Sequence, residues 1–230
     1  MSLQLLNLRV AYSPEKEVIK GISTTFSAAH IHGIVGFNGA GKTSLLNTLA
    51  GIVPLSGGSI LWDDRPLTRH DIAYLETTNF FYSYLSGRDY LRIFPNKSTA
   101  FDEEGWAALL ELPLDELIEN YSTGMKKKLA LLGIIKLNRS LIILDEPFNG
   151  LDMQAVHLLK EVIARLRQQQ KTVLVTSHIL ETLTSVCDSI HHLQNGVIAG
   201  VYSPEQFPLL DKVLFEQASH SLREKLDSLF

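Results

Sequence analysis

A glycine-rich segment at residues 36–43 constrains this chain more than any other stretch of its sequence. It follows a short apolar run and precedes a helix-forming stretch, which is the strand, loop and helix context of a phosphate-binding loop. Its glycines permit unusual backbone dihedrals, so main-chain N–H groups can approach a triphosphate, and the next helix adds unpaired donors and the positive end of its dipole. The segment predicts triphosphate binding by Gly36, Phe37, Asn38, Gly39, Ala40, Gly41, Lys42, Thr43 and Ser44. Of these, we expect Lys42 to reach the β- and γ-phosphates and Thr43 to place its hydroxyl on Mg²⁺.

Two later apolar stretches end in side chains suited to phosphate chemistry. Residues 141–144 form a continuous apolar run of the kind found in parallel sheets covered on both faces, and Asp145 and Glu146 follow directly. Asp145 can hold Mg²⁺ through its water shell, and Glu146 can accept a proton from the water that attacks the γ-phosphate. His178 follows the strand-like run 172–176, at the sheet edge where α/β folds bind ligands, and can orient that water.

The phosphate-binding loop, the buried run at 141–144 and the hydrophobic periodicity together predict an α/β fold: a P-loop NTPase core with a mostly parallel sheet, an N-terminal antiparallel β portion and an inserted helical lobe. We expect one domain over residues 1–230, whose amphipathic tail helix begins near Leu214. Its predicted parts are the nucleotide-binding core at 1–85 and 138–205, the helical lobe at 86–137 and the tail helix at 206–230.

Composition narrows the classes of function and partner. The 230 residues are 45% hydrophobic, and 25 acidic against 21 basic residues give a net charge of −4, so no overall field favours nucleic acid. The single cysteine, Cys187, excludes an internal disulfide and fits a reducing compartment. No apolar run approaches the ~20 residues of a membrane span, and the first residues lack the pattern of a signal peptide. We therefore expect a cytoplasmic protein that meets a membrane only through a partner.

Several further residues leave two interpretations open. Tyr12 can stack on an adenine ring or be a half-buried turn residue. Ser122 is a natural helix cap, and the three lysines at 126–128 that follow it suit either an anion site or a solvated turn. The aromatic residues at 80–84 suit a core or a surface that receives a partner helix. His191 and its neighbour at 192 are interpreted as structural.

Together these motifs resemble the nucleotide-binding subunit of the ATP-binding cassette family over nearly the whole chain. Tyr12 matches the family's adenine-stacking aromatic, residues 36–43 its Walker A loop and residues 141–146 its Walker B strand. Residues 150–152, which end in Asp152, resemble its D-loop, and His178 resembles its switch histidine. Residues 121–125 resemble its signature motif in an exporter-like form, with Ser122 and Gly124 retained.

The resemblance implies a head-to-tail homodimer, in which the signature residues of one subunit cover ATP bound to the other. It implies an ATPase subunit, with ATP and Mg²⁺ as ligands, that drives a separate transmembrane permease from the inner face of the cell membrane. Two alternatives remain: a soluble cassette ATPase in translation or DNA maintenance, and a cassette that binds ATP with little hydrolysis.

One position departs from the family's pattern. The family normally has glutamine after the strand at 72–75, where this chain has Thr77, preceded by Glu76. We expect Thr43 to be the only direct protein ligand of Mg²⁺, with water in the place of the glutamine oxygen, because Mg²⁺ commonly keeps several waters. Coupling to the permease would then depend on the aromatic segment 80–84.

Overall fold

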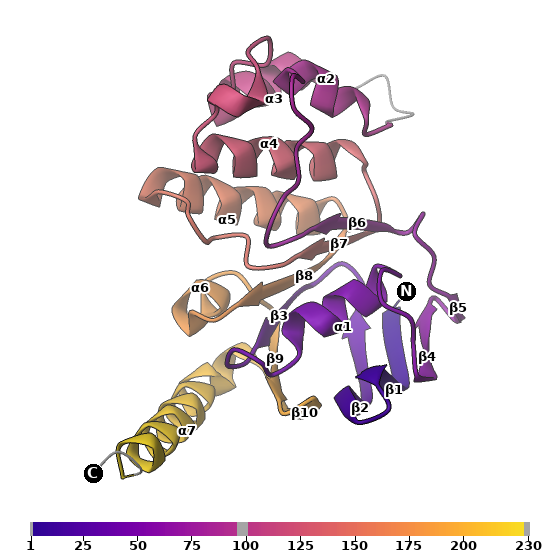
Figure 1. The fold of residues 1–230 in the computed structure, drawn as a ribbon, viewed down its shortest axis with the longest axis vertical. Coiled ribbons are helices and arrows are strands. Elements are labelled where there is room, and N and C mark those ends of the chain that lie inside the picture. The colour runs from indigo at the N-terminus through magenta and orange to yellow at the C-terminus, as the bar shows by residue number, and fades with distance from the viewer. Residues whose placement is uncertain (1, 96–100, 228–230) are drawn as a thin grey trace.

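The computed structural model describes residues 2–95 and 101–227, which form two sheets and a helical layer (Figure 1). The last three residues of the predicted tail helix lie outside the described part of the chain. The first sheet is antiparallel, in the order β2-β1-β4-β5. Its strands are β1 (Ser2–Ser13), β2 (Lys16–Ser27), β4 (Gly57–Trp62) and the short β5 (Arg65–Pro66), which the sequence analysis missed.

The second sheet has the order β10-β9-β3-β8-β7-β6, and all its pairs are parallel except β9 with β10. Its strands are β3 (Ile31–Val35), β6 (Ile72–Leu75), β7 (Leu141–Leu144), β8 (Thr172–Ser177), β9 (Ser189–Gln194) and β10 (Val197–Tyr202). This topology confirms the predicted α/β fold with a mostly parallel sheet and an antiparallel N-terminal portion. The predicted division into subdomains stays a prediction.

The parallel sheet is buried on both faces, which explains the continuous apolar runs of its central strands. In β7, Ile142 and Leu144 face a core shared with α4 (Thr123–Lys136) and α5 (Met153–Gln168). Leu141 and Ile143 point the other way, into a core shared with α1 (Lys42–Leu49) and the antiparallel sheet. The alternation of side chains along one strand thereby joins the two halves of the core.

The helical lobe contains α2 (Gly87–Arg92), α3 (Glu103–Leu110) and α4, with α2 and α3 on the far side of α4 from the sheet (Figure 1). It has a hydrophobic cluster of its own, built around Leu91, Leu110, Leu129 and Leu132. Side chains near its N-terminus stabilise the start of α2. The Ser86 side chain accepts a hydrogen bond from the main-chain N–H of Asp89, and the Asp89 side chain accepts one from the main-chain N–H of Ser86, which is a capping box.

One sequence prediction is wrong in detail. The tail helix α7 (Phe207–Asp227) begins well before Leu214, after a 3₁₀ turn at Pro204–Gln206 that Ser203 caps. Phe207 and Leu210 are buried against the main core, and this burial extends the helix toward the sheet. The remaining helix, α6 (Leu180–Thr184), is short. Among the described residues, no helix is both long and apolar enough to cross a membrane.

Candidate active site

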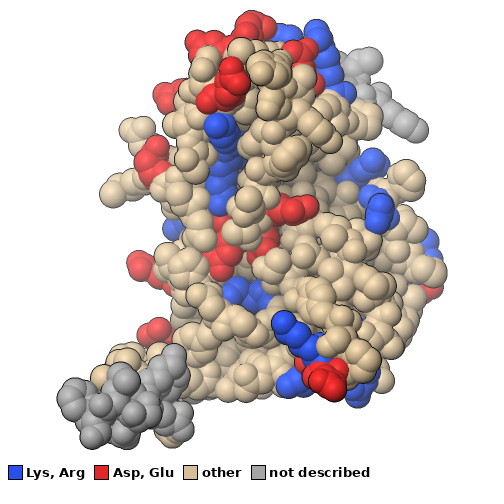
Figure 2. Space-filling model, in the orientation of Figure 1, with Lys and Arg blue, Asp and Glu red and all other residues tan. Residues whose placement is uncertain are grey.

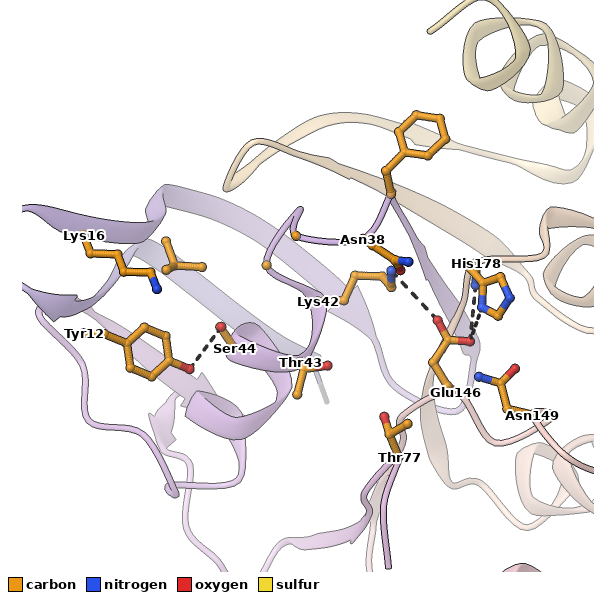
Figure 3. Close-up of a pocket in the computed structure, with 14 residues that line it drawn as sticks. Tyr12, Lys16, Asn38, Lys42, Thr43, Ser44, Thr77, Glu146, Asn149 and His178 are labelled. Carbon is orange, nitrogen blue, oxygen red and sulfur yellow. Dashed lines mark hydrogen bonds and ion pairs between the residues drawn. The ribbon is translucent and has the colours of Figure 1, made fainter. Parts of the chain in front are cut away.

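An open cavity of about 580 Å³ lies at the carboxyl edge of the parallel sheet (Figure 3). Strands β3, β8 and β7 are parallel neighbours, so the segments that follow them meet at this edge. The antiparallel sheet closes the cavity on another side. Its lining residues are Tyr12, Lys16, Val18, Phe37, Asn38, Gly39, Gly41, Lys42, Thr43, Ser44, Thr77, Glu146, Asn149 and His178.

The loop after β3 needs glycine at two positions for different reasons. Gly41, the residue before α1, has φ 108°, and a Cβ there would lie 2.9 Å from Ile19 Cδ1. Gly36 would place a Cβ 2.3 Å from the carbonyl oxygen of Leu193. The first glycine therefore supplies a backbone turn that other residues avoid, and the second allows the loop to pack against β9.

Lys42 lies between this loop and the acidic end of β7. Its ammonium donates a hydrogen bond to the carbonyl oxygen of Gly36 over 2.7 Å and lies 3.9 Å from Glu146 Oε1. The side chain is almost fully buried, so its charge acts in surroundings that screen it less than water does. A phosphate in the cavity would meet a fixed positive charge.

Thr43 and Asp145 form an oxygen pair beneath the loop. The Thr43 hydroxyl donates to Asp145 Oδ2 over 2.9 Å, and the Thr176 hydroxyl donates to Asp145 Oδ1 over 2.6 Å. Asp145 is completely buried. Hard oxygens of this kind suit Mg²⁺, which typically takes one or two protein oxygens and completes its shell with water and phosphate. No group of three or more His, Cys, Asp or Glu side chains suited to a metal exists within the described residues.

Glu146 is held by its backbone and its side chain. Its φ of 49° lies in the left-handed region, which is unusual for a residue with a side chain and concentrates at functional sites. Its N–H donates to the Thr176 hydroxyl over 2.8 Å. One carboxylate oxygen, Oε2, lies 2.9 Å from His178 Nδ1 and accepts the main-chain N–H of His178 over 3.3 Å. The dashed lines in Figure 3 show this pair beside Lys42.

Tyr12 lies at the mouth of the cavity with 54% of its surface exposed. It belongs to β1 and is not in a turn, so the interpretation of a half-buried turn residue is wrong. Its hydroxyl lies 3.1 Å from Ser44 Oγ, which leaves the ring available on the side of the cavity where Lys16 lies (Figure 3).

Six of the predicted site residues do not line this cavity. Gly36 packs against β9, Ala40 is buried, and Asp145 lies behind Thr43, to which it is bonded. The other three are Ser122, Gly124 and Asp152. Ser122 accepts a hydrogen bond from the Met125 N–H at the start of α4, and Asp152 accepts one from the Ala155 N–H at the start of α5. Gly124 is near Gly150, which lies between β7 and α5, since a Cβ on Gly124 would lie 3.8 Å from the Gly150 carbonyl oxygen. In one chain Ser122 and Asp152 cap helices, Gly124 lies in the first turn of α4, and none of the three lines the cavity.

The sequence analysis also missed cavity and site residues. Lys16 and Asn149 line the cavity, although neither was singled out. Lys127 was expected at an anion site or in a solvated turn, but its side chain is buried and its ammonium donates to the Glu146 and Asn149 carbonyl oxygens. The helical period could have indicated this, because Lys127 shares a face of α4 with Ala130, Leu131 and Ile134.

The departure from the family's glutamine places Thr77 at the cavity and Glu76 away from it. Thr77 lines the cavity, whereas Glu76 is exposed and is not among the lining residues. The aromatic segment beyond them is divided. Phe81 is partly buried and packs against the core, with its ring centre 5.0 Å from that of Tyr90, while Phe80, Tyr82 and Tyr84 are exposed by 75%, 63% and 81%.

A parallel sheet with a glycine loop, a helix-borne lysine and a carboxylate pair at its edge defines a P-loop nucleotide-binding protein. Comparison with known proteins makes this more specific. The chain belongs to the ABC transporter family, since a family model described as "ABC transporter" matches residues 19–149.

Individual relatives agree with this assignment. The chain is 31% identical over 195 residues to the ABC transporter ATP-binding protein YtrB of Bacillus subtilis, a match that covers 80% of this chain and 66% of that relative. It is 26% identical over 204 residues to the lantibiotic transport ATP-binding protein SrtF of Streptococcus pyogenes, covering 85% of this chain and 88% of SrtF. A solved structure of an ATP binding subunit of an ABC transporter has a TM-score of 0.86 and 26% identity, covering 94% of this chain and 99% of that one.

Proposed function

We propose that this chain binds ATP with Mg²⁺ and hydrolyses it as the ATPase subunit of a membrane transporter. The observation that supports this best is that Lys42, Thr43 and the Glu146–His178 pair line one cavity, with Asp145 bonded to Thr43 behind it. Positive charge, metal-binding oxygens and a proton acceptor are the groups that phosphoryl transfer to water requires.

Binding uses the loop and the antiparallel sheet. The triphosphate lies against the main-chain N–H groups of the loop, and Lys42 exchanges its bond with Gly36 for phosphate oxygens. The base stacks on the exposed ring of Tyr12. Thr43 and Asp145 would hold Mg²⁺, Asp145 through water, and the bound ion would neutralise charge on the β- and γ-phosphate oxygens.

Hydrolysis uses Glu146 as the general base. A water oxygen attacks the γ-phosphorus, the bond from that phosphorus to the bridging oxygen breaks, and ADP leaves while Glu146 takes the proton of the water. His178 fixes the Glu146 carboxylate through its ring and its main-chain N–H, so that the second oxygen, Oε1, faces Lys42 and the cavity.

The active form is a dimer attached to a permease. Ser122 and Gly124 lie outside their own chain's cavity, which fits a role in covering ATP bound to a second copy. The exposed aromatic residues Phe80, Tyr82 and Tyr84 are suited to packing against a membrane subunit at the inner face of the membrane. On the face in Figure 2, basic and acidic side chains are interspersed, so this face offers no extended positive surface for nucleic acid.

The direct test is Glu146→Gln, which keeps the shape of the side chain and removes its basicity. We expect ATP affinity by calorimetry to stay within about twofold of the parent, and steady-state ATP hydrolysis to fall by ~10²–10⁴, the usual contribution of a general base. Lys160→Met on the outer part of α5 is a control that should hydrolyse ATP like the parent. Unchanged hydrolysis by Glu146→Gln would remove Glu146 from the mechanism.

A further inference from the structure

Lys127 is a buried lysine whose contacts the proposed chemistry does not use. Its side chain is 8% exposed, and its ammonium donates to the carbonyl oxygen of Glu146 over 2.7 Å and to that of Asn149 over 2.9 Å. Both acceptors belong to the turn that follows β7. Lys127 itself lies in α4, so these two bonds join the helical lobe to the edge of the parallel sheet.

The turn to which Lys127 donates its hydrogen bonds contains two residues that line the cavity. Glu146 and Asn149 both line it, and the Asn149 N–H donates to the Glu146 carbonyl oxygen over 3.3 Å. That carbonyl therefore accepts from the turn itself and from α4. Because Glu146 has a left-handed backbone conformation, its carboxylate direction depends on contacts that hold this unusual geometry in place.

The free-energy cost of burying the Lys127 ammonium must be offset by favourable contacts. Loss of water lowers the pKa of Lys127, and the nearby Glu146 and Asp145 oppose this effect. An apolar side chain of similar length would avoid the desolvation penalty, and the neighbouring positions Ala130 and Leu131 are apolar. The two main-chain oxygens that receive a charged donor from Lys127, at a turn bearing the proposed catalytic carboxylate, supply these contacts.

Lys127 also lies close to the residues that are proposed to cover a second subunit's ATP. It is one helical turn beyond Gly124, in the helix that Ser122 caps. A rigid helix with a lysine fixed to the Glu146 turn links the position of its N-terminus to the position of the general base.

We propose that Lys127 is a positioning residue, which holds the Glu146–Asn149 turn in its catalytic geometry and couples this geometry to the placement of α4. The inference rests on the proposed ATP hydrolysis for its consequence, but its structural part, the hold on the turn, can be measured without ATP. Lys127 does not touch the reacting atoms in this arrangement, since it binds main-chain oxygens of the turn.

The first measurement is hydrogen exchange of the segment 145–152 in the nucleotide-free protein. Lys127→Met removes the donor while keeping the length of the side chain, and we expect exchange in this segment to rise by about tenfold, as for a lost buried hydrogen bond. Lys136→Met is the matched control. Lys136 lies in the same helix and is partly buried, and it donates to the Leu91 carbonyl oxygen and to the Glu103 carboxylate, so its contacts stay within the lobe.

The second measurement is ATP hydrolysis in two backgrounds. Lys127→Met should lower kcat by about 10- to 100-fold with little change in KM, because the general base is displaced and the phosphate site is intact. In the Glu146→Gln background, the same substitution should lower the residual rate by less than about twofold, since the group it positions is already absent. Lys127→Gln replaces the ammonium by an amide that can still donate a hydrogen bond, so it should recover part of kcat. It also provides the test if the methionine variant does not fold.

The outcomes separate the two proposals. Unchanged exchange at 145–152 in the folded Lys127 variants overturns the positioning role, and so does an equal loss of rate with and without Glu146. A parent protein that does not hydrolyse ATP overturns the proposed function, while the exchange data still decide whether Lys127 holds the turn. Faster exchange with loss of kcat only where Glu146 is present supports the inference.

Discussion

The ring of Tyr12 is exposed, while its hydroxyl lies within hydrogen-bond distance of Ser44. This single residue can therefore be tested for stacking on the base of ATP. Stacking on a base is worth roughly 0.5–1.5 kcal/mol, so Tyr12→Ala should weaken ATP binding by about two- to twelvefold in calorimetry. Hydrolysis at saturating ATP should change little. Tyr12→Phe, which keeps the ring and loses only the hydroxyl, should bind ATP like the parent.

Inorganic triphosphate distinguishes stacking from an indirect effect on the loop. It offers phosphates without a base, so Tyr12→Ala should bind it as the parent does. A matching loss of affinity for ATP and for triphosphate would mean that Tyr12 supports the loop through Ser44 and does not stack on the base.

Single residues also show why sequence reasoning has limits. Lys42, Asp145 and Glu146 were found because their neighbours along the chain reveal the loop or strand that presents them. The buried role of Lys127 was not predicted, because a lysine beside two other lysines indicates a side chain exposed to solvent. Only the fold brings the turn after β7 against that face of the helix. Lys16 and Asn149 were likewise not predicted, because only the fold brings them to the cavity.

At the scale of elements, a group of aromatic rings joins the two sheets. Phe26 of β2 lies 4.3 Å from the ring of His191 in β9, and both contact His32 of β3. Each histidine has a polar partner: His32 Nδ1 lies 2.8 Å from Ser189 Oγ, and His191 Nδ1 lies 3.3 Å from Thr24 Oγ1. These contacts agree with the structural role expected for His191.

The buried rings predict a loss of stability in mild acid. Burial lowers the pKa of His191 to about 3 and also lowers that of His32, from an ordinary value of 6.5. The unfolded chain therefore binds more protons below pH 6.5, so the free energy of unfolding falls from pH 6.5 toward the folded pKa, by up to ~1.4 kcal/mol per pH unit for each ring.

Urea unfolding at pH 7 and pH 5 measures this effect. His191→Phe keeps a ring against Phe26 but removes the titrating group, so its stability should depend less on pH over this interval than that of the parent. Equal pH dependence in parent and variant would show that His191 is not a source of the acid sensitivity.

The elements were predictable where burial and periodicity coincide. The sequence placed β6, β7 and most of β8 and α4 because apolar runs and caps mark them directly. The start of α7 was misplaced because Phe207 and Leu210 are buried by contacts with distant residues. The two-residue β5 depends on its pairing with β4 and has no periodicity of its own.

For the whole molecule, formation of the proposed dimer can be tested separately from ATP binding by a single chain. Ser122 lies outside its own cavity, so Ser122→Arg should leave ATP affinity of the single chain within about twofold while preventing ATP-driven dimerisation by steric and charge conflict. Sedimentation velocity with ATP in the Glu146→Gln background reports the dimer without turnover.

Ser122→Thr separates the interface from the helix cap. Threonine keeps the hydroxyl that accepts the Met125 N–H, so α4 should remain capped and the variant should still dimerise. If Ser122→Arg forms dimers as readily as the parent, the signature residues do not face a second subunit's nucleotide.

The helical lobe has a hydrophobic cluster around Leu91, Leu129 and Leu132 to which no described strand contributes, whereas α4 also packs into the main core. The outer helices α2 and α3 therefore depend on α4 for their packing, and we expect them to open by local unfolding more readily than the strands do. A lobe opened in this way would expose the helix faces that pack against α4 while α4 itself stays bonded to the turn after β7.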